Sequence, residues 1–221
     1  RSTRYPLGDA LPVAEEIVAV LSACPAARKV NAAGSLRRRK PTVGDIDILA
    51  TASQPQDVVD CFVGQPRVRE VVSHGDVKAT VILDNGIQVD LMVLPDEHYG
   101  SLLQHFTGSK DHNVHLRQLA LDKGLSFSEK GFLRQDGSLL LCPNEEDVYR
   151  TLDLPWIPPE LREDEGEFDA ARHGSLPRLV EVRDIAGDLH VHSRWSDGTM
   201  SIEEIALAAG RLGYAYVGVA D

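Results

Sequence analysis

Apolar positions recur with a helical period near the start of the chain and with a strand period further along it. Between residues 11 and 21 they fall three or four positions apart, which predicts an amphipathic helix. Two apolar segments, 79–83 and 87–93, flank Asp84-Asn85-Gly86, and the Asn-Gly pair favours the tight turn of a β-hairpin. The same criteria predict further elements: strands at 29–33, 45–50 and 68–73, a helix at 55–62, helices at 99–105 and 110–123, short strands within 125–141, and a helix that begins at Asn144.

Regular periodicity stops between residues 154 and 183, where prolines, acidic residues and a glycine predominate. This composition is typical of a linker. Beyond it, residues 185–192 and 215–219 have the pattern of strands and residues 201–212 that of a helix, which together predict one β-α-β unit. We therefore expect an α+β fold, followed by the start of a second domain.

Composition indicates a soluble protein. A chain of 221 residues, 43% of them hydrophobic, can bury a sizeable core as one large domain or as one domain with part of another. No apolar run approaches the ~20 residues that cross a bilayer, and the first residues lack the apolar centre of a signal peptide, so we expect neither export nor a membrane partner. Cys24, Cys61 and Cys142 lie far apart without a CxxC pair, which argues against a zinc ribbon or a disulfide framework and favours a reducing compartment.

Charge is distributed unevenly along the chain. The formal net charge of −11 argues by itself against nucleic acid as a partner, because phosphate binding usually needs a basic surface. Ten acidic residues and only two arginines lie between residues 145 and 169, however, whereas residues 28–40 contain six basic residues and no acidic one. A solvated charged face would explain the basic run as long as no binding motif adjoins it.

Carboxylates beside this basic run suggest a metal site. Asp45 and Asp47 are two apart on an expected strand, so both point to one face, where their repulsion calls for a bound cation such as Mg²⁺. For the pair alone, two solvent-facing aspartates at a strand end would be the alternative. If the hairpin pairs beside this strand, Asp90 on its second arm brings a third carboxylate, and such a trio can hold two ions for in-line phosphoryl transfer.

A turn at Gly34-Ser35 starts a new helix directly after the strand at 29–33. Ser35 and Arg38 stand just after Gly34, where free backbone N–H groups and a guanidinium can hold the phosphates of a nucleotide. A nucleotide would then be the ligand of the basic run at residues 28–40.

Two motifs in the right order resemble the nucleotidyltransferase palm of family X DNA polymerases. One is Gly34-Ser35 followed by Gly44-Asp-Ile-Asp47, and the other is the segment from His105-Phe-Thr-Gly-Ser109 through Asn113 to Arg117. The resemblance covers roughly residues 4–161. It implies the following domains: a palm with a mixed sheet at 1–100, a small α/β thumb at 101–161 and an acidic, proline-containing linker at 162–184.

The resemblance also implies roles for individual residues. Asp45 and Asp47 would bridge two Mg²⁺ or Mn²⁺ ions, and Asp90 would bind the catalytic ion and help to deprotonate a primer 3′-OH. The other implied contacts are Gly34, Ser35, Arg38 and Gly44 with the triphosphate, with Arg4 a weaker candidate, His105, Phe106 and Gly108 with the sugar, Asn113 with the base edge, and Lys110 and Arg117 with DNA.

Some of these residues have structural alternatives, and two depart from the family pattern. His105 and Phe106 could simply pack at a helix end, and Asn113 and Arg117, four apart, could form an exposed polar pair. Many relatives have tyrosine where His105 stands, so discrimination between deoxyribose and ribose is not carried over. An animal member of the family has arginine where Gln88 stands, which leaves the orientation of the primer end open.

A second motif follows the expected linker. His190 and His192 lie two apart at a strand end, so that both imidazoles face one way, and Asp197 follows as a further ligand. The segment resembles the opening of a PHP phosphoesterase domain, which follows the palm in bacterial members of the family and is linked to 3′–5′ exonuclease activity with Zn²⁺ or Mn²⁺. Residues 185–221 would then be the incomplete β-α-β start of that barrel, without a competent hydrolase site. Two surface histidines are the alternative.

The resemblance implies a bacterial DNA polymerase of the repair type that acts on gapped or primer-template DNA with a dNTP. We expect a cytoplasmic monomer, associated with the nucleoid when bound to DNA, and a chain that is part of a longer protein. Three alternatives stay open. The longer protein could be chiefly a PHP hydrolase whose palm positions DNA, the palm could be a degenerate DNA clamp, or the chain could be a small nucleotidyltransferase that modifies RNA or protein.

Overall fold

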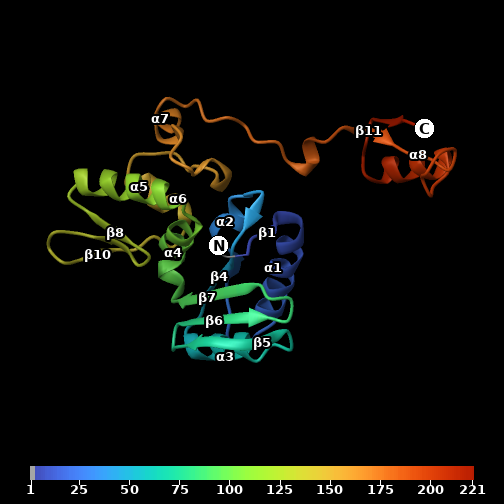
Figure 1. Ribbon diagram of the computed structural model, residues 1–221. Coiled ribbons are helices and arrows are strands. Elements are labelled where there is room, and N and C mark those ends of the chain that lie inside the picture. The colour runs from blue at the N-terminus through green and yellow to red at the C-terminus, as the bar shows by residue number, and fades with distance from the viewer. Residues whose placement is uncertain (1–2) are drawn as a thin grey trace. The chain divides into compact units, whose positions relative to one another are not determined.

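The computed structural model describes residues 3–221, and a five-stranded sheet organises the first part of the chain (Figure 1). Its strands lie in the order β2-β4-β7-β6-β5, and only the central β4–β7 pair is parallel. The bounds are β2 Val30–Ala32, β4 Ile46–Thr51, β5 Val68–His74, β6 Lys78–Leu83 and β7 Gln88–Leu94. The expected hairpin is confirmed, since β6 and β7 pair in antiparallel register and Gly86 has the positive φ of +86° that the turn requires.

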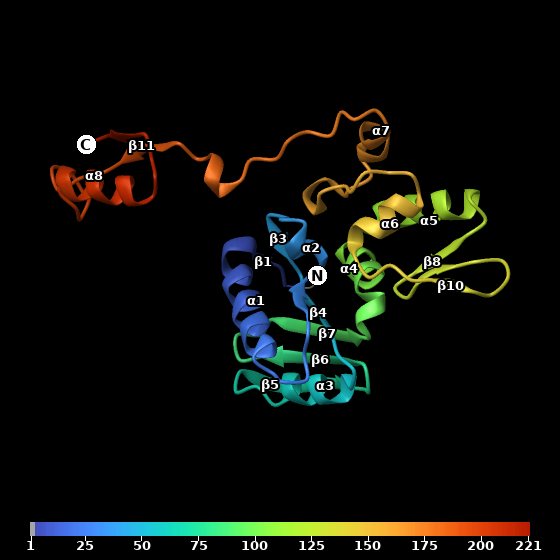
Figure 2. The same cartoon turned by 180° about the vertical axis from the view of Figure 1, so that it is seen from behind.

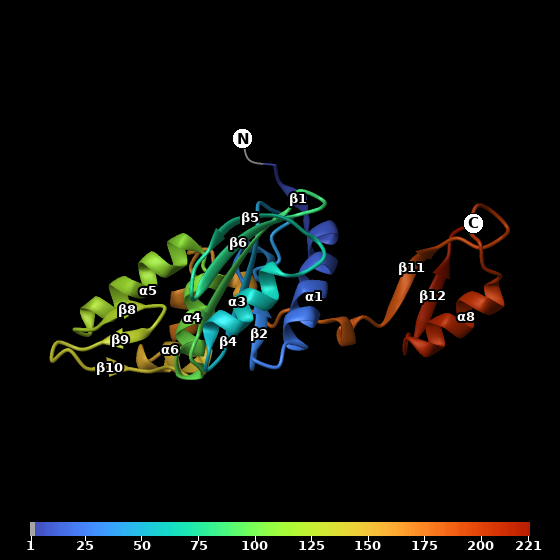
Figure 3. The same ribbon diagram turned by 90° about the horizontal axis from the view of Figure 1, so that it is seen from below.

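Helices α1 (Leu7–Ser22) and α3 (Pro55–Val63) cover one face of this sheet (Figure 3). Alternation along β4 sends Ile46 and Ile48 into the core with these helices, while Leu49 faces the other side and packs with Leu102 of α4 (Tyr99–Thr107). The face opposite α1 and α3 is therefore apolar only at the C-terminal ends of β4 and β7. Polar side chains occupy its other half.

Three short elements complete the sheet region. The expected helix start at Gly34 is confirmed by α2 (Gly34–Arg37), and β1 (Tyr5–Pro6) pairs with β3 (Thr42–Val43). Because β3 leads directly into β4, this small ladder fixes the loop that carries Gly44 and Asp45.

A second apolar core forms after the sheet. It unites α5 (Lys110–Asp122), α6 (Glu145–Thr151) and the antiparallel strands β8 (Ser126–Ser128), β9 (Gly131–Leu133) and β10 (Leu139–Leu140) (Figure 2). Ser109 caps α5 by accepting a hydrogen bond from the backbone of His112, and Asn144 forms a capping box with Asp147. The short 3-10 segment Asp96–His98 leads from β7 into α4, and a second one, Pro159–Leu161, follows α6.

The expected linker differs from the structure at its start. Residues 162–172 do not form an extended connection, because Arg162 is fully buried and α7 (Glu167–Arg172) places Phe168 in the second core. His112 and Glu167 join α5 to α7 at 2.6 Å. Such buried polar pairs between distant segments leave no trace in a local hydrophobic pattern, so the sequence suggested a linker.

The chain divides into two compact units, with the boundary between Leu176 and Pro177. The second unit consists of a 3-10 turn (Val182–Asp184), β11 (Gly187–Val191), α8 (Ile202–Arg211) and β12 (Tyr216–Val219). The expected β-α-β unit is confirmed, since β11 and β12 are parallel. Ser201 caps α8 through a capping box with Glu204.

One expectation about the cysteines is wrong. Cys24 and Cys61, 37 positions apart, form a disulfide with their Cα atoms 6.6 Å apart. The physical reason is that α1 and α3 pack on the same sheet face, so the end of one helix lies beside the other. The separation of the two cysteines along the chain gives no indication that they are close in space. Among the described helices, none combines the length and apolar character needed to cross a membrane.

Candidate functional site

Strand register brings the predicted carboxylates together. Asp47 on β4 lies directly opposite Asp90 on the neighbouring parallel strand β7, and such strands are about 4.8 Å apart. Asp45 lies in the bend directly before β4, not on the strand as expected, yet it is near enough to Asp47 for its charge to raise the pKa of that carboxyl. Asp47 and Asp90 lie on the half of the sheet face that the apolar side chains of β4 and β7 leave free.

Burial and the two neighbouring carboxylates together shift the pKa of Asp47. Burial, followed by the negative charges of Asp45 and Asp90, raises the pKa of Asp47 from 3.8 to about 7, although Lys78 and Arg38 oppose the shift. A divalent cation would reverse this shift, and carboxylate oxygens are the ligands that Mg²⁺ prefers. The donor set therefore fits such an ion.

The side chains are not arranged as a finished metal cage. Within the described part of the chain, no three His, Cys, Asp or Glu side chains are grouped closely enough to hold one ion. The carboxylate of Asp90 instead accepts hydrogen bonds from the hydroxyl of Thr80 and from Gln88 Nε2, the latter at 2.8 Å. Each oxygen of Asp90 accepts one of these hydrogen bonds and keeps a lone pair with which it can also bind an ion.

Gly34 approaches Asp47 so closely that a larger residue would displace the Asp47 carboxylate. It has a φ of +60°, and a Cβ atom at this position would lie 2.0 Å from Asp47 Oδ2. The backbone of Ala33 also donates to the carbonyl of Asp47 at 2.8 Å. The turn that starts α2 is thereby held against the carboxylates, as a phosphate-binding turn beside metal ions should be.

A hollow of about 400 Å³ adjoins this turn. It brings together most of the predicted site residues: Gly34, Ser35, Arg38, Asp45, Asp47, His105, Phe106, Gly108, Lys110, Asn113 and Arg117. Asp90 lines a smaller cavity that shares Asp47 and Phe106 with it. Gly44 does not line the hollow; a Cβ atom there would lie 3.5 Å from Arg4, whose guanidinium donates to Thr42.

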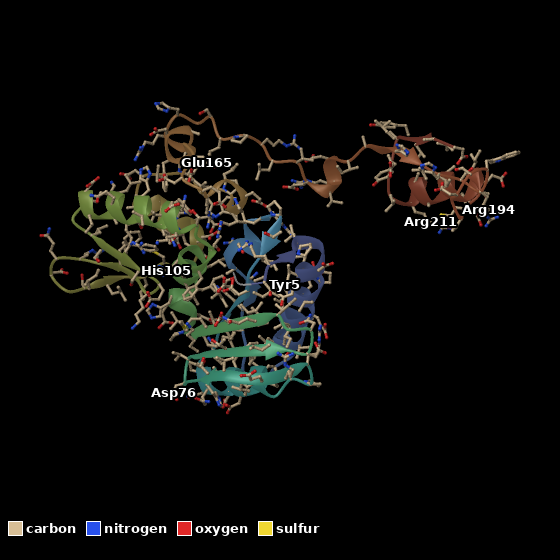
Figure 4. The ribbon with its side chains drawn as sticks, in the orientation of Figure 1. Tyr5, Asp76, His105, Glu165, Arg194 and Arg211 are labelled. Atoms are coloured by element: carbon tan, nitrogen blue, oxygen red, sulfur yellow. A yellow bond between two sulfur atoms is a disulfide. The ribbon has the colours of Figure 1, made fainter. Side chains whose placement is uncertain are left out.

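Residues of the α4–α5 turn are fixed by buried hydrogen bonds. Asn113 accepts from Gln104 Nε2 at 2.9 Å and donates to the carbonyl of His105 at 2.6 Å, so it is not the exposed polar residue of the alternative interpretation. The His105 side chain (Figure 4) is tilted against Phe106, and burial lowers its pKa, which keeps the ring uncharged near neutral pH.

Ion pairs join the end of α2 to residues 145–163, and the sequence pattern does not predict them. Arg37 forms a two-point pair with Glu145 at 2.7 and 2.9 Å, and the buried Arg162 donates to the same carboxylate at 2.6 Å. Burial alone would raise the pKa of Glu145, but these hydrogen bonds lower it to about 2. Arg38 pairs with Glu163. The only signal in the sequence was the acidic composition after residue 145, which also fits a solvated surface.

Comparison with known proteins identifies the family. A family model described as DNA polymerase beta thumb matches residues 102–163. The chain is 39% identical over 221 residues to "DNA polymerase/3'-5' exonuclease PolX" of Bacillus subtilis (strain 168), covering 99% of this chain and 38% of that protein. The chain belongs to family X of the DNA polymerases. It is also 29% identical over 163 residues to DNA polymerase lambda of Rattus norvegicus, covering 60% of this chain and 28% of that protein.

Family X membership agrees with the fold, which combines a palm-like sheet with the matched thumb. The residues that line the hollow come from both parts, since α2 and the start of β4 supply those on the sheet side, and α4, α5 and the turn between them supply the rest. The chain spans well under half the length of these relatives.

The second motif lies in the second unit. The Nε2 atoms of His190 and His192 are 3.0 Å apart, and His192 Nδ1 lies 3.0 Å from Asp197. Asp221 accepts from the backbone of Ser193 at 2.6 Å and from Ser196 at 2.7 Å. The two imidazoles thus lie on the same side of the strand end, close enough to contact each other.

Proposed function

We propose that this chain forms the catalytic part of a DNA-directed DNA polymerase of the repair type, which transfers a deoxynucleoside monophosphate to a primer 3′-OH. The observation that carries the proposal is the direct pairing of Asp47 with Asp90 beside the Gly34 turn. Two Mg²⁺ or Mn²⁺ ions bound by Asp45, Asp47 and Asp90 would supply charge neutralisation for the in-line displacement.

The residues of the hollow have complementary tasks in this reaction. The backbone N–H groups after Gly34, together with Ser35, Gly44 and Arg38, hold the triphosphate in position. His105, Phe106 and Gly108 flank the sugar, and Asn113, fixed by its two hydrogen bonds, faces the base edge. Lys110 and Arg117 bind DNA phosphates, and Asp90 accepts the proton of the 3′-OH at its carboxylate.

The second unit belongs to a further activity in this proposal. His190, His192 and Asp197 are ligands of the PHP type for Zn²⁺ or Mn²⁺, and the longer protein also removes nucleotides from a 3′ end. Support comes from the paired imidazoles and from the printed name of the Bacillus subtilis relative, which includes a 3′–5′ exonuclease.

Substitution of the third aspartate tests the polymerase assignment. In the full-length protein, Asp90→Asn should reduce nucleotide incorporation on gapped DNA at least about a hundredfold, because it removes the proton acceptor and a metal ligand. Nuclease activity should be retained. Incorporation and nuclease products can be measured in one assay with a labelled primer and added Mg²⁺ or Mn²⁺.

The control is Asp76→Asn, an exposed aspartate in the β5–β6 turn (Figure 4) that should leave both activities unchanged. Full incorporation by Asp90→Asn would refute the assignment. Wild-type protein that shows nuclease activity but no nucleotide incorporation would favour the alternative, in which the palm only positions DNA. Incorporation on RNA but not on gapped DNA would favour a nucleotidyltransferase of another substrate class.

A further inference from the structure

Glu163 has no role in the reaction proposed above, although it contacts the phosphate-side arginine. It follows the fully buried Arg162, and its carboxylate accepts a hydrogen bond from Arg38 Nε at 2.9 Å. Lys40 Nζ lies 3.4 Å from the same oxygen. The side chains of Arg38 and Glu163 are only 13% and 22% exposed, so solvent weakens this pair less than it would a surface ion pair.

Arg38 is held at two points of its guanidinium. Besides the contact with Glu163, Arg38 Nη1 donates to the carbonyl of Thr107 at 2.6 Å. Because the guanidinium is planar and rigid, two fixed nitrogens determine the direction of the third. Among the described residues, none accepts a hydrogen bond from Nη2, and the Arg38 side chain lines the hollow beside Gly34 and Ser35.

Holding an arginine in advance has an energetic consequence for anion binding. A free arginine side chain has about 2 kcal/mol of rotamer entropy, part of which is lost when it binds a phosphate. If Glu163 and Thr107 already hold the side chain, a triphosphate binds without this loss. Lys40 keeps the local charge positive, because one carboxylate then lies between two cations.

We infer that Glu163 is a positioning residue that holds Arg38 so that its free nitrogen faces the phosphates of the incoming nucleotide. The inference deepens the proposed function and rests on it for the identity of the ligand. Glu163 lies at the end of the segment that matches the thumb model, whereas Arg38 follows α2. The triphosphate-binding group is therefore oriented by a residue 125 positions further along the chain.

The test compares Glu163→Ala with Glu163→Gln in the full-length protein. We expect the alanine variant to raise the KM for dNTP about tenfold, equivalent to ~1.4 kcal/mol, with kcat changed less than about twofold. The glutamine variant should stay close to the wild type, because its amide oxygen still accepts from Arg38 Nε. Glu165→Ala is the matched control, since this exposed glutamate two residues away has no ion pair among the described residues (Figure 4).

A double-mutant cycle shows whether Glu163 acts through Arg38. Arg38→Ala alone should raise the KM at least as much as Glu163→Ala, and adding Glu163→Ala to it should have no further effect. Additive effects would overturn the inference. So would an unchanged KM in Glu163→Ala, or a lower one, which would show that Glu163 competes with the nucleotide for Arg38.

A binding measurement separates this inference from the proposed function. The dissociation constant of dNTP with Ca²⁺, measured by calorimetry, needs no turnover and should rise about tenfold in Glu163→Ala. Wild-type protein that binds dNTP but does not incorporate it would refute the polymerase proposal alone. Equal binding by the wild type and Glu163→Ala would refute the positioning role alone.

Discussion

The distance between the turn at Gly34 and the carboxylate of Asp47 depends on a single atom, the Cβ that glycine lacks. Because Gly34 has no Cβ, the start of α2 can lie against Asp47, which is paired with Asp90 on the neighbouring strand. Burial, followed by the charges of Asp45 and Asp90, raises the pKa of Asp47, as expected for carboxylates that share a confined site. The close approach of the Gly34 backbone to Asp47 is built into the fold of the chain.

Substitution of Gly34 tests this close approach. In Gly34→Ala the new Cβ would overlap Asp47 Oδ2, and the positive φ of +60° adds strain of roughly 1 to 3 kcal/mol. We expect incorporation to fall at least about tenfold, with a lower unfolding midpoint in thermal denaturation. Gly8→Ala is the control, since nothing lies within 4 Å of its added methyl group. Wild-type kinetics of Gly34→Ala would contradict the proposed geometry.

Contacts between elements far apart in the sequence hold the C-terminal part of the first unit in place. α7 is attached to α5 by the buried pair of His112 and Glu167, and Tyr149 of α6 lies 3.1 Å from the other ring nitrogen of His112. His112 also stacks on Phe168 at a centroid distance of 4.4 Å. A neutral imidazole satisfies this arrangement when Nδ1 donates to Glu167 and Nε2 accepts from the tyrosine hydroxyl.

This arrangement makes stability depend on pH. Burial lowers the pKa of His112 below its usual 6.5, so below that value the unfolded chain binds a proton that the folded chain excludes. The free energy of unfolding should therefore fall as the pH drops below about 6.5. We expect His112→Gln, which cannot titrate, to show a smaller fall between pH 7 and 5 in urea denaturation. An identical pH profile for both proteins would show that His112 is not the group responsible.

Whether the sequence predicts a feature of the fold depends on how far apart along the chain the interacting residues are. The turn at Asn85-Gly86 and the cap at Asn144 are local, and both elements are confirmed at nearly the expected positions. The Cys24–Cys61 disulfide and the burial of Arg162 depend on which helices pack together, and a hydrophobic pattern does not specify that. The GS and DxD motifs indicated the site, but the contact of Glu163 with Arg38 appears only in the folded chain.

At the scale of the whole molecule, the uneven charge distribution has a partly structural explanation. The net charge of −11 includes an acidic run that appeared to be solvated, yet Glu145 and Glu163 from that run pair with Arg37 and Arg38 of the basic run. Basic side chains near the hollow are thus partly neutralised within the chain. The other basic residues that line the hollow, Lys110 and Arg117, belong to α5.

The boundary between the two units can be located by limited proteolysis. Arg178 and Arg183 have exposed side chains between α7 and β11, whereas Arg162 is fully buried, so trypsin should cleave first after Arg178 or Arg183. The product that ends there retains both apolar cores and should keep the unfolding midpoint of the first unit. Mass spectrometry of early digests and a thermal scan of the isolated product measure both outcomes.

Arg178→Gln with Arg183→Gln removes both sites and should delay cleavage without changing stability, because these exposed ion pairs contribute little. Early cleavage after Arg162 would instead show that α7 is detached from the first unit in solution. In that case the carboxylate of Glu163 would not be held beside Arg38, and the positioning of the phosphate-binding guanidinium would need another source. The digestion pattern therefore tests the packing on which the role of Glu163 depends.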